Sequence, residues 1–245
     1  MGRLKNKKIS EMEQIKKKLK IVAIVPAYNE EKTIGNVLKQ LLKAKELDEI
    51  ILACDGSTDK TAEIGRNFNV RVLESPKEGK GQTMREAVAK TDAEIIAFFD
   101  ADLIGLIPEH VSQLVEPILR NEAAMVVGIR DRLGETPSFL VKIDPLLAFG
   151  GERALKRSIF ENVPEKFGQG FAIETALNYY CKLNKLPVLH VKLKGLDMVM
   201  KEKKVGMVKG FWERLEMHWY IRKMRFLMKR HKEEFRNRAS ITEFP

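Results

Sequence analysis

The sequence lacks any uninterrupted apolar run of the roughly 18–20 residues that a membrane-spanning helix needs. It has only two cysteines, Cys54 and Cys181, too few for a disulfide scaffold or a cysteine-based zinc site. Residues 1–20 lack an apolar signal core and a small-residue cleavage site, and Asn6 departs from the myristoylation pattern. We therefore expect a reduced, cytoplasmic protein.

Negative charge is scarce at both ends of the chain, whose formal net charge is +10. Residues 1–20 hold 8 Lys or Arg against 2 Asp or Glu, and residues 201–238 hold 13 against 5. The central part is therefore mildly acidic, which argues against a nucleic-acid-binding body. Basic ends on such a body suit an anionic membrane surface at least as well as a polynucleotide.

Composition and charge divide the 245 residues into three segments. Residues 1–20 are a basic N-terminal arm or helix, residues 21–200 a globular body, and residues 201–245 a basic amphipathic helical tail. Hydrophobic residues make up 44% of the chain and charged ones 32%, so a sizeable core can form and global disorder is excluded.

Short apolar runs alternate with amphipathic segments through the body. Strands are expected at 20–26, 49–54, 70–73, 94–99, 124–129 and 188–193. Helices are expected at 30–44 (capped by Asn29), 60–67, 81–90, 109–120, from Gly150 onward, and at 171–182. This alternation predicts an α/β fold with right-handed crossovers and a mainly parallel sheet, whose ligands bind at the carboxyl ends of the strands.

The triplet Asp100-Ala101-Asp102 closes a strand of hydrophobic residues, so both carboxylates emerge at the ligand-binding edge. Adjacent carboxylates repel each other unless a cation lies between them, and hard oxygen ligands favour Mg²⁺ or Mn²⁺. A solvated pair of strand-end residues is the alternative. Asp55 repeats the pattern at the end of the neighbouring strand, in Asp55-Gly56-Ser57-Thr58-Asp59, where turn and cap chemistry is the alternative.

The loop Gly79-Lys80-Gly81 lacks the spacing of a P-loop and of a Rossmann dinucleotide site. Its glycines still permit close backbone approach at a helix N-terminus, which binds anions, and Lys80 adds a positive charge. A plain surface loop is the alternative.

Four motifs in order, Val25-Pro26-Ala27-Tyr28-Asn29-Glu30, the Asp55 segment, Gly79-Lys80-Gly81 and Asp100-Ala101-Asp102, resemble family 2 glycosyltransferases of the GT-A fold. The resemblance is strong over residues 20–130 and weaker to about 200. It implies a nucleotide-sugar donor, UDP-sugar in preference to GDP-sugar, and a divalent cation, Mg²⁺ or Mn²⁺. By that resemblance the donor-binding residues are Pro26, Tyr28, Glu30, Asp55, Lys80, Asp100 and Ala101. Asp102 is then the principal metal ligand and a catalytic residue beside Asp100.

The second half is expected to hold the acceptor. Gly150-Gly151-Glu152-Arg153 and Gly168 to Thr175 look like the acceptor loop and the glycine-then-glutamate segment of family 2 enzymes, and are similar to segments of glucosyl-3-phosphoglycerate synthases. The resemblance assigns Gly150, Gly151 and Arg153 to acceptor binding and Glu174 to catalysis. Helix-dipole stabilisation of Glu174 and a salt bridge for Arg153 are the alternatives.

Related enzymes often place a histidine metal ligand after the last strand, where this chain has Asp197 followed by Met198. Asp197 is therefore expected to replace that ligand.

The tail carries one apolar helical stripe with arginines and lysines around it. Its members are Met217, Tyr220, Ile221, Met224, Leu227 and Met228. The stripe packs on the body, pairs two subunits, or lies in a membrane interface.

The sequence thus predicts a metal-dependent hexosyltransferase whose acceptor is lipid-linked or phosphorylated. The alternative in the same class is a soluble enzyme resembling glucosyl-3-phosphoglycerate synthases. A nucleotidyltransferase would need a glycine-rich loop after the first strand, which residues 25–31 lack, and a nucleic-acid-binding protein would need a basic body. We expect no nucleic-acid partner, a peripheral position on the inner face of the membrane, and a homodimer through the C-terminal helix.

Overall fold

The computed structural model describes residues 19–130, 151–170, 172–198, 220 and 222–236. The basic arm before Leu19, the acceptor-loop residue Gly150 and most of the tail lie outside the described residues. In the described part of the chain, no helix combines the length and apolar character needed to cross a bilayer.

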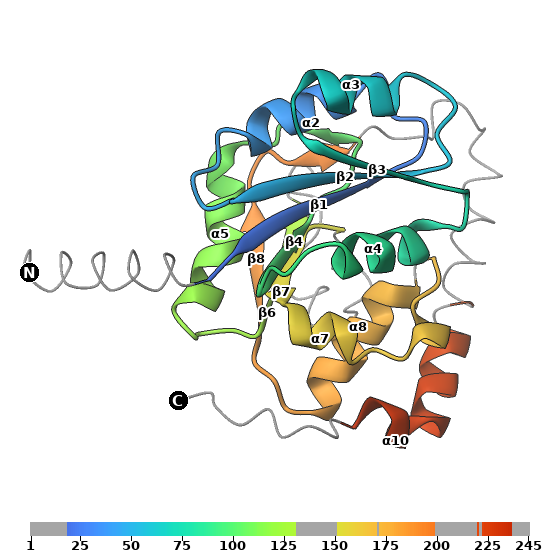
Figure 1. Ribbon diagram of the computed structural model, residues 1–245. Helices are drawn as coiled ribbons and strands as arrows, with labels where there is room; N and C mark the ends of the chain where they lie inside the picture. The colour runs from blue at the N-terminus through green and yellow to red at the C-terminus, as the bar shows by residue number, and fades with distance from the viewer. Residues whose placement is uncertain (1–18, 131–150, 171, 199–219, 221, 237–245) are drawn as a thin grey trace, which may run out of the picture.

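A seven-stranded sheet forms the centre of the described residues (Figure 1). In spatial order its strands are β3 (Arg71–Ser75), β2 (Glu49–Asp55), β1 (Ile21–Ala27), β4 (Ile95–Phe98), β7 (Arg153–Lys156), β6 (Met125–Arg130) and β8 (Val188–Leu193). Strands β3, β2, β1 and β4 are parallel, as are β6 and β8, whereas β7 runs antiparallel to both β4 and β6. The mainly parallel sheet expected from the sequence is therefore confirmed.

Helices cover both faces of this sheet (Figure 1). One apolar core lies under α2 (Ile34–Leu41), α3 (Thr61–Asn67) and α5 (Pro108–Leu119). The other lies under α4 (Lys80–Ala89), α7 (Arg157–Glu161) and α8 (Ala172–Leu183), with the short 3-10 helix η2 (Glu165–Phe167) beside them. Residues of β1 alternate between the two cores, because successive side chains of a strand point to opposite faces.

A second, two-stranded sheet lies beyond the end of β4. Its strands β5 (Leu103–Ile104) and β9 (Asp197–Met198) are antiparallel. Ile104 pairs with Asp197, so the chain that follows the Asp100-Ala101-Asp102 triplet lies beside a segment almost a hundred residues later.

The first helix begins later than expected. α2 starts at Ile34, not at residue 30, and Asn29 does not cap it. Asn29 instead has a left-handed backbone with a φ of 54°, and its Oδ1 accepts a hydrogen bond from the amide of Thr58 at 2.8 Å. That expectation was wrong because the side chain found a partner in the loop after the neighbouring strand β2, outside its own helix.

The segment after Gly150 was expected to open a helix, and this was also wrong. Residues Arg153–Lys156 form β7, and the helix α7 begins only at Arg157. Because β7 fills the gap between β4 and β6, its backbone groups are hydrogen-bonded on both edges. Sheet position overrides local preference here.

The tail stripe packs on the body in its described part. Residues 222–230 are helical and lead into α10 (Lys232–Phe235) below α7 and α8 (Figure 1). Met228 and Phe235 are fully buried in the second core, and Met224 and Leu227 pack against it. Met217 and Ile221 lie outside the described residues. The first of the three alternatives for the stripe is therefore the observed one for these side chains.

Candidate active site

Charged side chains from five separate segments gather at the carboxyl ends of the parallel strands. Asp100 follows β4, Arg130 ends β6, and Lys80 is the first residue of α4. Arg153 begins β7, and Glu174 lies in the first turn of α8. This edge is where open α/β sheets bind their ligands.

Asp100 is held by two cations. Its Oδ1 accepts a hydrogen bond from Nζ of Lys80 at 2.8 Å, and its Oδ2 accepts one from Nη2 of Arg130. Burial alone would raise the pKa of this carboxyl group, but Lys80 and Arg130 outweigh burial and lower the pKa of Asp100 to about 2. Asp100 is therefore ionised at neutral pH.

Each of the two cations has a second carboxylate. Lys80 Nζ donates to Oε1 of Glu174 at 3.0 Å, and Glu174 Oε2 lies 3.6 Å from Nη2 of Arg153. Arg130 donates from Nε and Nη2 to the two oxygens of Glu152, at 2.9 and 2.7 Å. The six side chains form one alternating series, here called the ion-pair chain: Glu152, Arg130, Asp100, Lys80, Glu174 and Arg153.

The ion-pair chain stabilises the charged forms of its two central cations, Lys80 and Arg130, although burial opposes both. Burial lowers the pKa of Lys80, but Glu174 and Asp100 more than offset it and raise that pKa above the ordinary value. Glu152 and Asp100 likewise raise the pKa of Arg130 against the effect of burial. Burial is the main cause that raises the pKa of Glu152, and Arg130 opposes the rise.

Glycine makes this packing possible. A Cβ on Gly151 would overlap both carboxylate oxygens of Asp100, and a Cβ on Gly81 would overlap the carbonyl oxygen of Gly168. The first turn of α4 therefore lies directly against the loop before α8, which brings Lys80 to Glu174. Gly151, expected at the acceptor, is placed against Asp100, and Gly150 lies outside the described residues.

The metal-ligand candidates are only partly assembled. Asp102 is 7% exposed just past β4, and Asp197 is brought to the same end by the pairing of β5 with β9. Oδ1 of Asp197 accepts a hydrogen bond from the amide of Met198 at 2.8 Å. Among the described residues, no group of three or more His, Cys, Asp or Glu side chains could hold a metal. Asp100 and Asp102 offer the carboxylate oxygens that Mg²⁺ or Mn²⁺ prefers, and such ions commonly take further oxygens from phosphates.

The donor-binding candidates line the first two strand ends. Both oxygens of Asp55 accept hydrogen bonds from the amides of Glu78 and Gly79, at 2.7 to 3.1 Å, so Asp55 orders the loop that carries Lys80. Tyr28 is 41% exposed, with the ammonium of Lys77 4.0 Å from its ring centre.

The other three donor candidates are less open. Oε2 of Glu30 accepts a hydrogen bond from the hydroxyl of Thr33 at 3.1 Å. Pro26 lies within β1, and Ala101 is buried between the two aspartates.

Arg153 differs from its expected role. It is 1% exposed, and its guanidinium turns toward Glu174, where Nη1 also donates to the backbone carbonyl at 3.5 Å. Because this buried guanidinium pairs with the carboxylate and the backbone carbonyl of Glu174, the salt-bridge alternative describes Arg153 better than acceptor binding does.

Sequence reasoning missed Arg130 and Glu152 as site residues. Arg130 follows directly after the strand expected at 124–129, and Glu152 stands inside the segment that was expected to bind the acceptor. The position of Arg130 at the carboxyl end of a strand was a usable signal. The bidentate pairing of Arg130 with Glu152 could not be predicted from the sequence, because it depends on β7 entering the sheet beside β6.

Comparison with known proteins places the chain in a family. The family model of glycosyl transferase family 2 matches residues 22–179. The curated relatives include glucosyl-3-phosphoglycerate synthases from Mycobacterium tuberculosis, 34% identical over 69% of this chain, and from Mycolicibacterium smegmatis, 29% identical over 69%. The chain spans 63% and 66% of the length of those two relatives.

A solved structure agrees with this assignment. The crystal structure of the M. tuberculosis synthase in complex with Mn²⁺, UDP and glucosyl-3-phosphoglycerate matches with a TM-score of 0.67 and 26% identity, covering 80% of this chain and 77% of that one. The expected GT-A-type fold is thereby confirmed. On the family model and on this structural match, the chain belongs to glycosyl transferase family 2.

Proposed function

We propose that this protein transfers a hexosyl group from a UDP-sugar to a phosphorylated acceptor. The observation that carries the proposal is the ion-pair chain at the ligand-binding edge of a family 2 fold. The M. tuberculosis synthase has been solved with Mn²⁺, UDP-glucose and phosphoglyceric acid, and with glycerol 3-phosphate in place of that acid. A UDP-sugar is therefore favoured over a GDP-sugar for this chain.

The first half of the sheet edge is proposed to bind the donor. Pro26, Tyr28, Glu30 and Asp55 line the nucleotide pocket, with Asp55 at the base or ribose. Lys80 lies beside the diphosphate, where an ammonium group and a helix N-terminus both favour negative charge. Ala101, which is buried between the two aspartates, completes this proposed donor set.

Asp102, with Asp100 and Asp197, is proposed to hold the divalent cation. When bound, Mg²⁺ or Mn²⁺ supplies Lewis-acid stabilisation of the diphosphate leaving group. Lys80 and Arg130, both within hydrogen-bonding distance of Asp100, keep that carboxylate ionised and oriented. Glu174 is proposed to bind sugar hydroxyls, since Lys80 and Arg153 fix its carboxylate from two sides.

A paired substitution tests the donor and metal assignment. In the full chain, Asp102→Ala should lose the Mn²⁺ dependence of UDP binding and the transfer of radiolabelled glucose to phosphoglyceric acid. Asp92→Ala removes the same group from an exposed ion pair with Lys20 and should leave both intact. Sugar transfer at the wild-type rate in Asp102→Ala would overturn the proposal.

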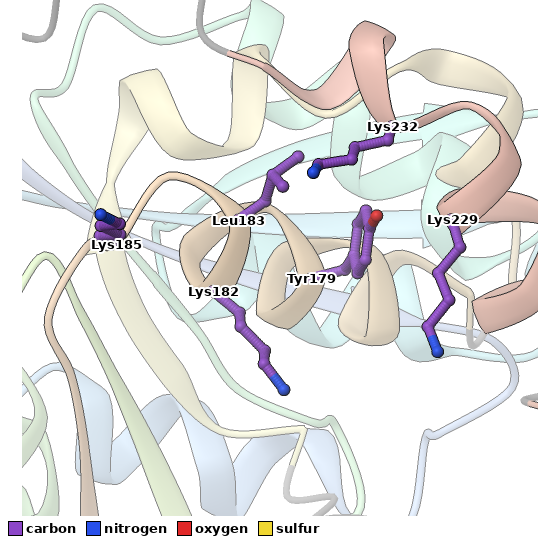
Figure 2. Close-up of a pocket in the computed structure, with 6 residues that line it drawn as sticks. All are labelled: Tyr179, Lys182, Leu183, Lys185, Lys229 and Lys232. Atoms are coloured by element: carbon purple, nitrogen blue, oxygen red, sulfur yellow. The ribbon is translucent and has the colours of Figure 1, made fainter.

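A lipid-linked acceptor is a second candidate, and one surface feature favours it. Lys182, Leu183 and Tyr179 of α8, with Lys185 after it, line a surface hollow together with Lys229 and Lys232 of the C-terminal segment (Figure 2). Within the described residues, none of the four ammonium groups forms an ion pair. Lys182 is eight residues from Glu174 along α8, or about 12 Å at the helical rise of 1.5 Å per residue.

An anionic bilayer facing this hollow would gain about 1 kcal/mol per lysine, and salt would screen the gain. The apolar stripe would contribute little to this contact, because Met224, Leu227 and Met228 pack in or against the core. A polyprenyl phosphate at such a surface offers an acceptor oxygen that is already ionised and needs no general base.

Vesicles separate the two acceptor classes. We expect wild-type protein to sediment with phosphatidylglycerol-containing vesicles at low salt, and Lys229→Glu/Lys232→Glu to release it. The matched control, Lys39→Glu/Lys43→Glu, makes the same charge change beside the opposite core, on and just after α2. Protein that stays free of these vesicles leaves the small phosphorylated acceptor as the proposal.

A homodimer through the C-terminal helix is also proposed. Analytical ultracentrifugation of the wild-type protein without vesicles tests it.

A further inference from the structure

Glu152 is a buried carboxylate that neither the donor nor the metal assignment uses. Its side chain is fully buried, and both of its oxygens accept hydrogen bonds from one guanidinium, that of Arg130. Burying an ion pair of this kind seldom adds stability, because desolvation offsets the Coulomb attraction. Its pairing with the guanidinium that also donates to Asp100 therefore points to a functional reason.

The pairing fixes where the positive charge of Arg130 lies. Nε and Nη2 of Arg130 both face Glu152, and Nη2 also reaches Oδ2 of Asp100. Nη1 contacts the sulfur of Met198 in β9, the strand that carries Asp197. With contacts to Glu152, Asp100 and Met198, the planar guanidinium is fixed in one orientation against Asp100.

Glu152 also contributes to the negative charge of this centre. Asp100, Glu152 and Glu174 pair with three cations, Lys80, Arg130 and Arg153, and the other two metal-ligand candidates, Asp102 and Asp197, lie at the same end of the sheet. Among these described residues, five carboxylates and three cations leave a formal balance of two negative charges. Removing the charge of Glu152 would halve this balance, and removing that of Arg130 would raise it to three negative charges.

We propose that Glu152 is a positioning residue that holds Arg130 against Asp100 and offsets its charge. The centre thereby stays attractive to a divalent cation and does not capture a nucleoside diphosphate in the absence of that cation. This inference rests on the proposed function, because it concerns the metal and the UDP group assigned there. It makes binding of UDP depend on binding of the cation.

The consequence is a pair of effects of opposite sign. Glu152→Gln keeps the shape of the side chain and removes its charge, so the affinity for Mn²⁺ alone should fall about tenfold or more. The affinity for UDP in metal-free buffer should rise by a similar factor, since one charge within a poorly screened site acts on both ligands. Loss of structure would instead lower the affinities for Mn²⁺ and for UDP together.

The experiment measures both affinities in the full-length protein. Electron paramagnetic resonance reports free Mn²⁺ in a titration without nucleotide, and calorimetry with EDTA reports UDP binding. Arg130→Gln should move both affinities in the reverse directions, and the double variant should return them toward wild type. Glu161→Gln, which removes a carboxylate from the exposed pair with Arg157, is the matched control and should change neither. Thermal unfolding verifies that each variant folds.

The outcomes distinguish this inference from the proposed function. Opposite shifts in Glu152→Gln, reversed in Arg130→Gln, support the positioning role. Shifts of the same sign, or none, overturn it while leaving the metal-dependent donor site in place. If Glu152→Gln fails to fold, the reverse shifts in Arg130→Gln decide the question by themselves. Wild-type protein that binds neither Mn²⁺ nor UDP overturns the proposed function and this inference together.

Discussion

Replacing Gly151 with alanine adds one methyl group at the centre of the ion-pair chain. A Cβ at this position would lie 2.5 Å from Cγ of Asp100, and closer still to both carboxylate oxygens. Gly151 does not have a positive φ, so alanine is allowed by the backbone and the effect is purely steric. To restore ordinary van der Waals contact, the carboxylate or the backbone must move by about 1 Å.

Such a displacement has two measurable consequences. Overpacking a tight site typically costs about 1–3 kcal/mol of the free energy of unfolding. A catalytic group misplaced by about 1 Å can lower the rate about 100-fold. We therefore expect Gly151→Ala to remain folded, with a modestly lower urea midpoint, and to lose about two orders of magnitude in kcat for sugar transfer.

A second glycine provides the control for Gly151→Ala. Gly35 lies in α2, where a Cβ would make ordinary contact with the ring of Phe68 at 3.5 Å. Gly35→Ala should stabilise the protein by about 0.5–1 kcal/mol, because alanine loses less conformational entropy in a helix than glycine does. Initial rates with a radiolabelled UDP-sugar and urea unfolding curves report both quantities. Wild-type kcat in Gly151→Ala would refute the packing of Gly151 against Asp100.

Three further predictions concern the donor loop, acid stability and the tail. Asp55→Ala should weaken UDP binding even without metal, and it should lower the free energy of unfolding by about 1–3 kcal/mol because the amides of Glu78 and Gly79 lose their acceptor. Calorimetry in EDTA measures the UDP affinity, and urea unfolding measures the stability. The pKa of Asp100 is lowered in the fold to about 2, so its ionised carboxylate adds about 2 kcal/mol to the free energy of unfolding above pH 4, and this contribution is lost as pH falls toward 2. Urea unfolding of Asp100→Asn should therefore show a weaker pH dependence in that range. Met228→Ala should cost about 2–5 kcal/mol, because it leaves a cavity under the C-terminal helix; an unchanged melting temperature would contradict its burial.

Much of the fold could be predicted because the strands carry a strong local signal. The run from Ile21 to Val25 is apolar without interruption, and it forms a strand buried on both faces. The strand at 188–193 was predicted with the bounds that it has. Such an apolar pattern predicts the strand reliably, because burial of those same side chains stabilises the strand in the tertiary structure.

Two local expectations failed where distant partners decided the conformation. The side chain of Asn29 bonds to Thr58 in the next crossover, so it was not available to cap its own helix. The residues after Gly151 form an inserted antiparallel strand, because the sheet has an open position between β4 and β6. Neither partner can be read from a window of neighbouring residues.

The sequence by itself determined the fold class, the ligand-binding edge and most of the candidate site residues, Asp55, Lys80, Asp100, Asp102 and Glu174 among them. Strand ends are local features, and the carboxyl ends of parallel strands meet at one edge. Only the tertiary structure decided how the charges pair. Asp100 finds Arg130 and Lys80, and Arg153 turns away to Glu174, because β7 enters the sheet in the antiparallel direction and glycines let two loops meet. The pairing of charges depends on contacts between residues far apart in the chain, and the pattern of residues adjacent in the sequence cannot predict those contacts.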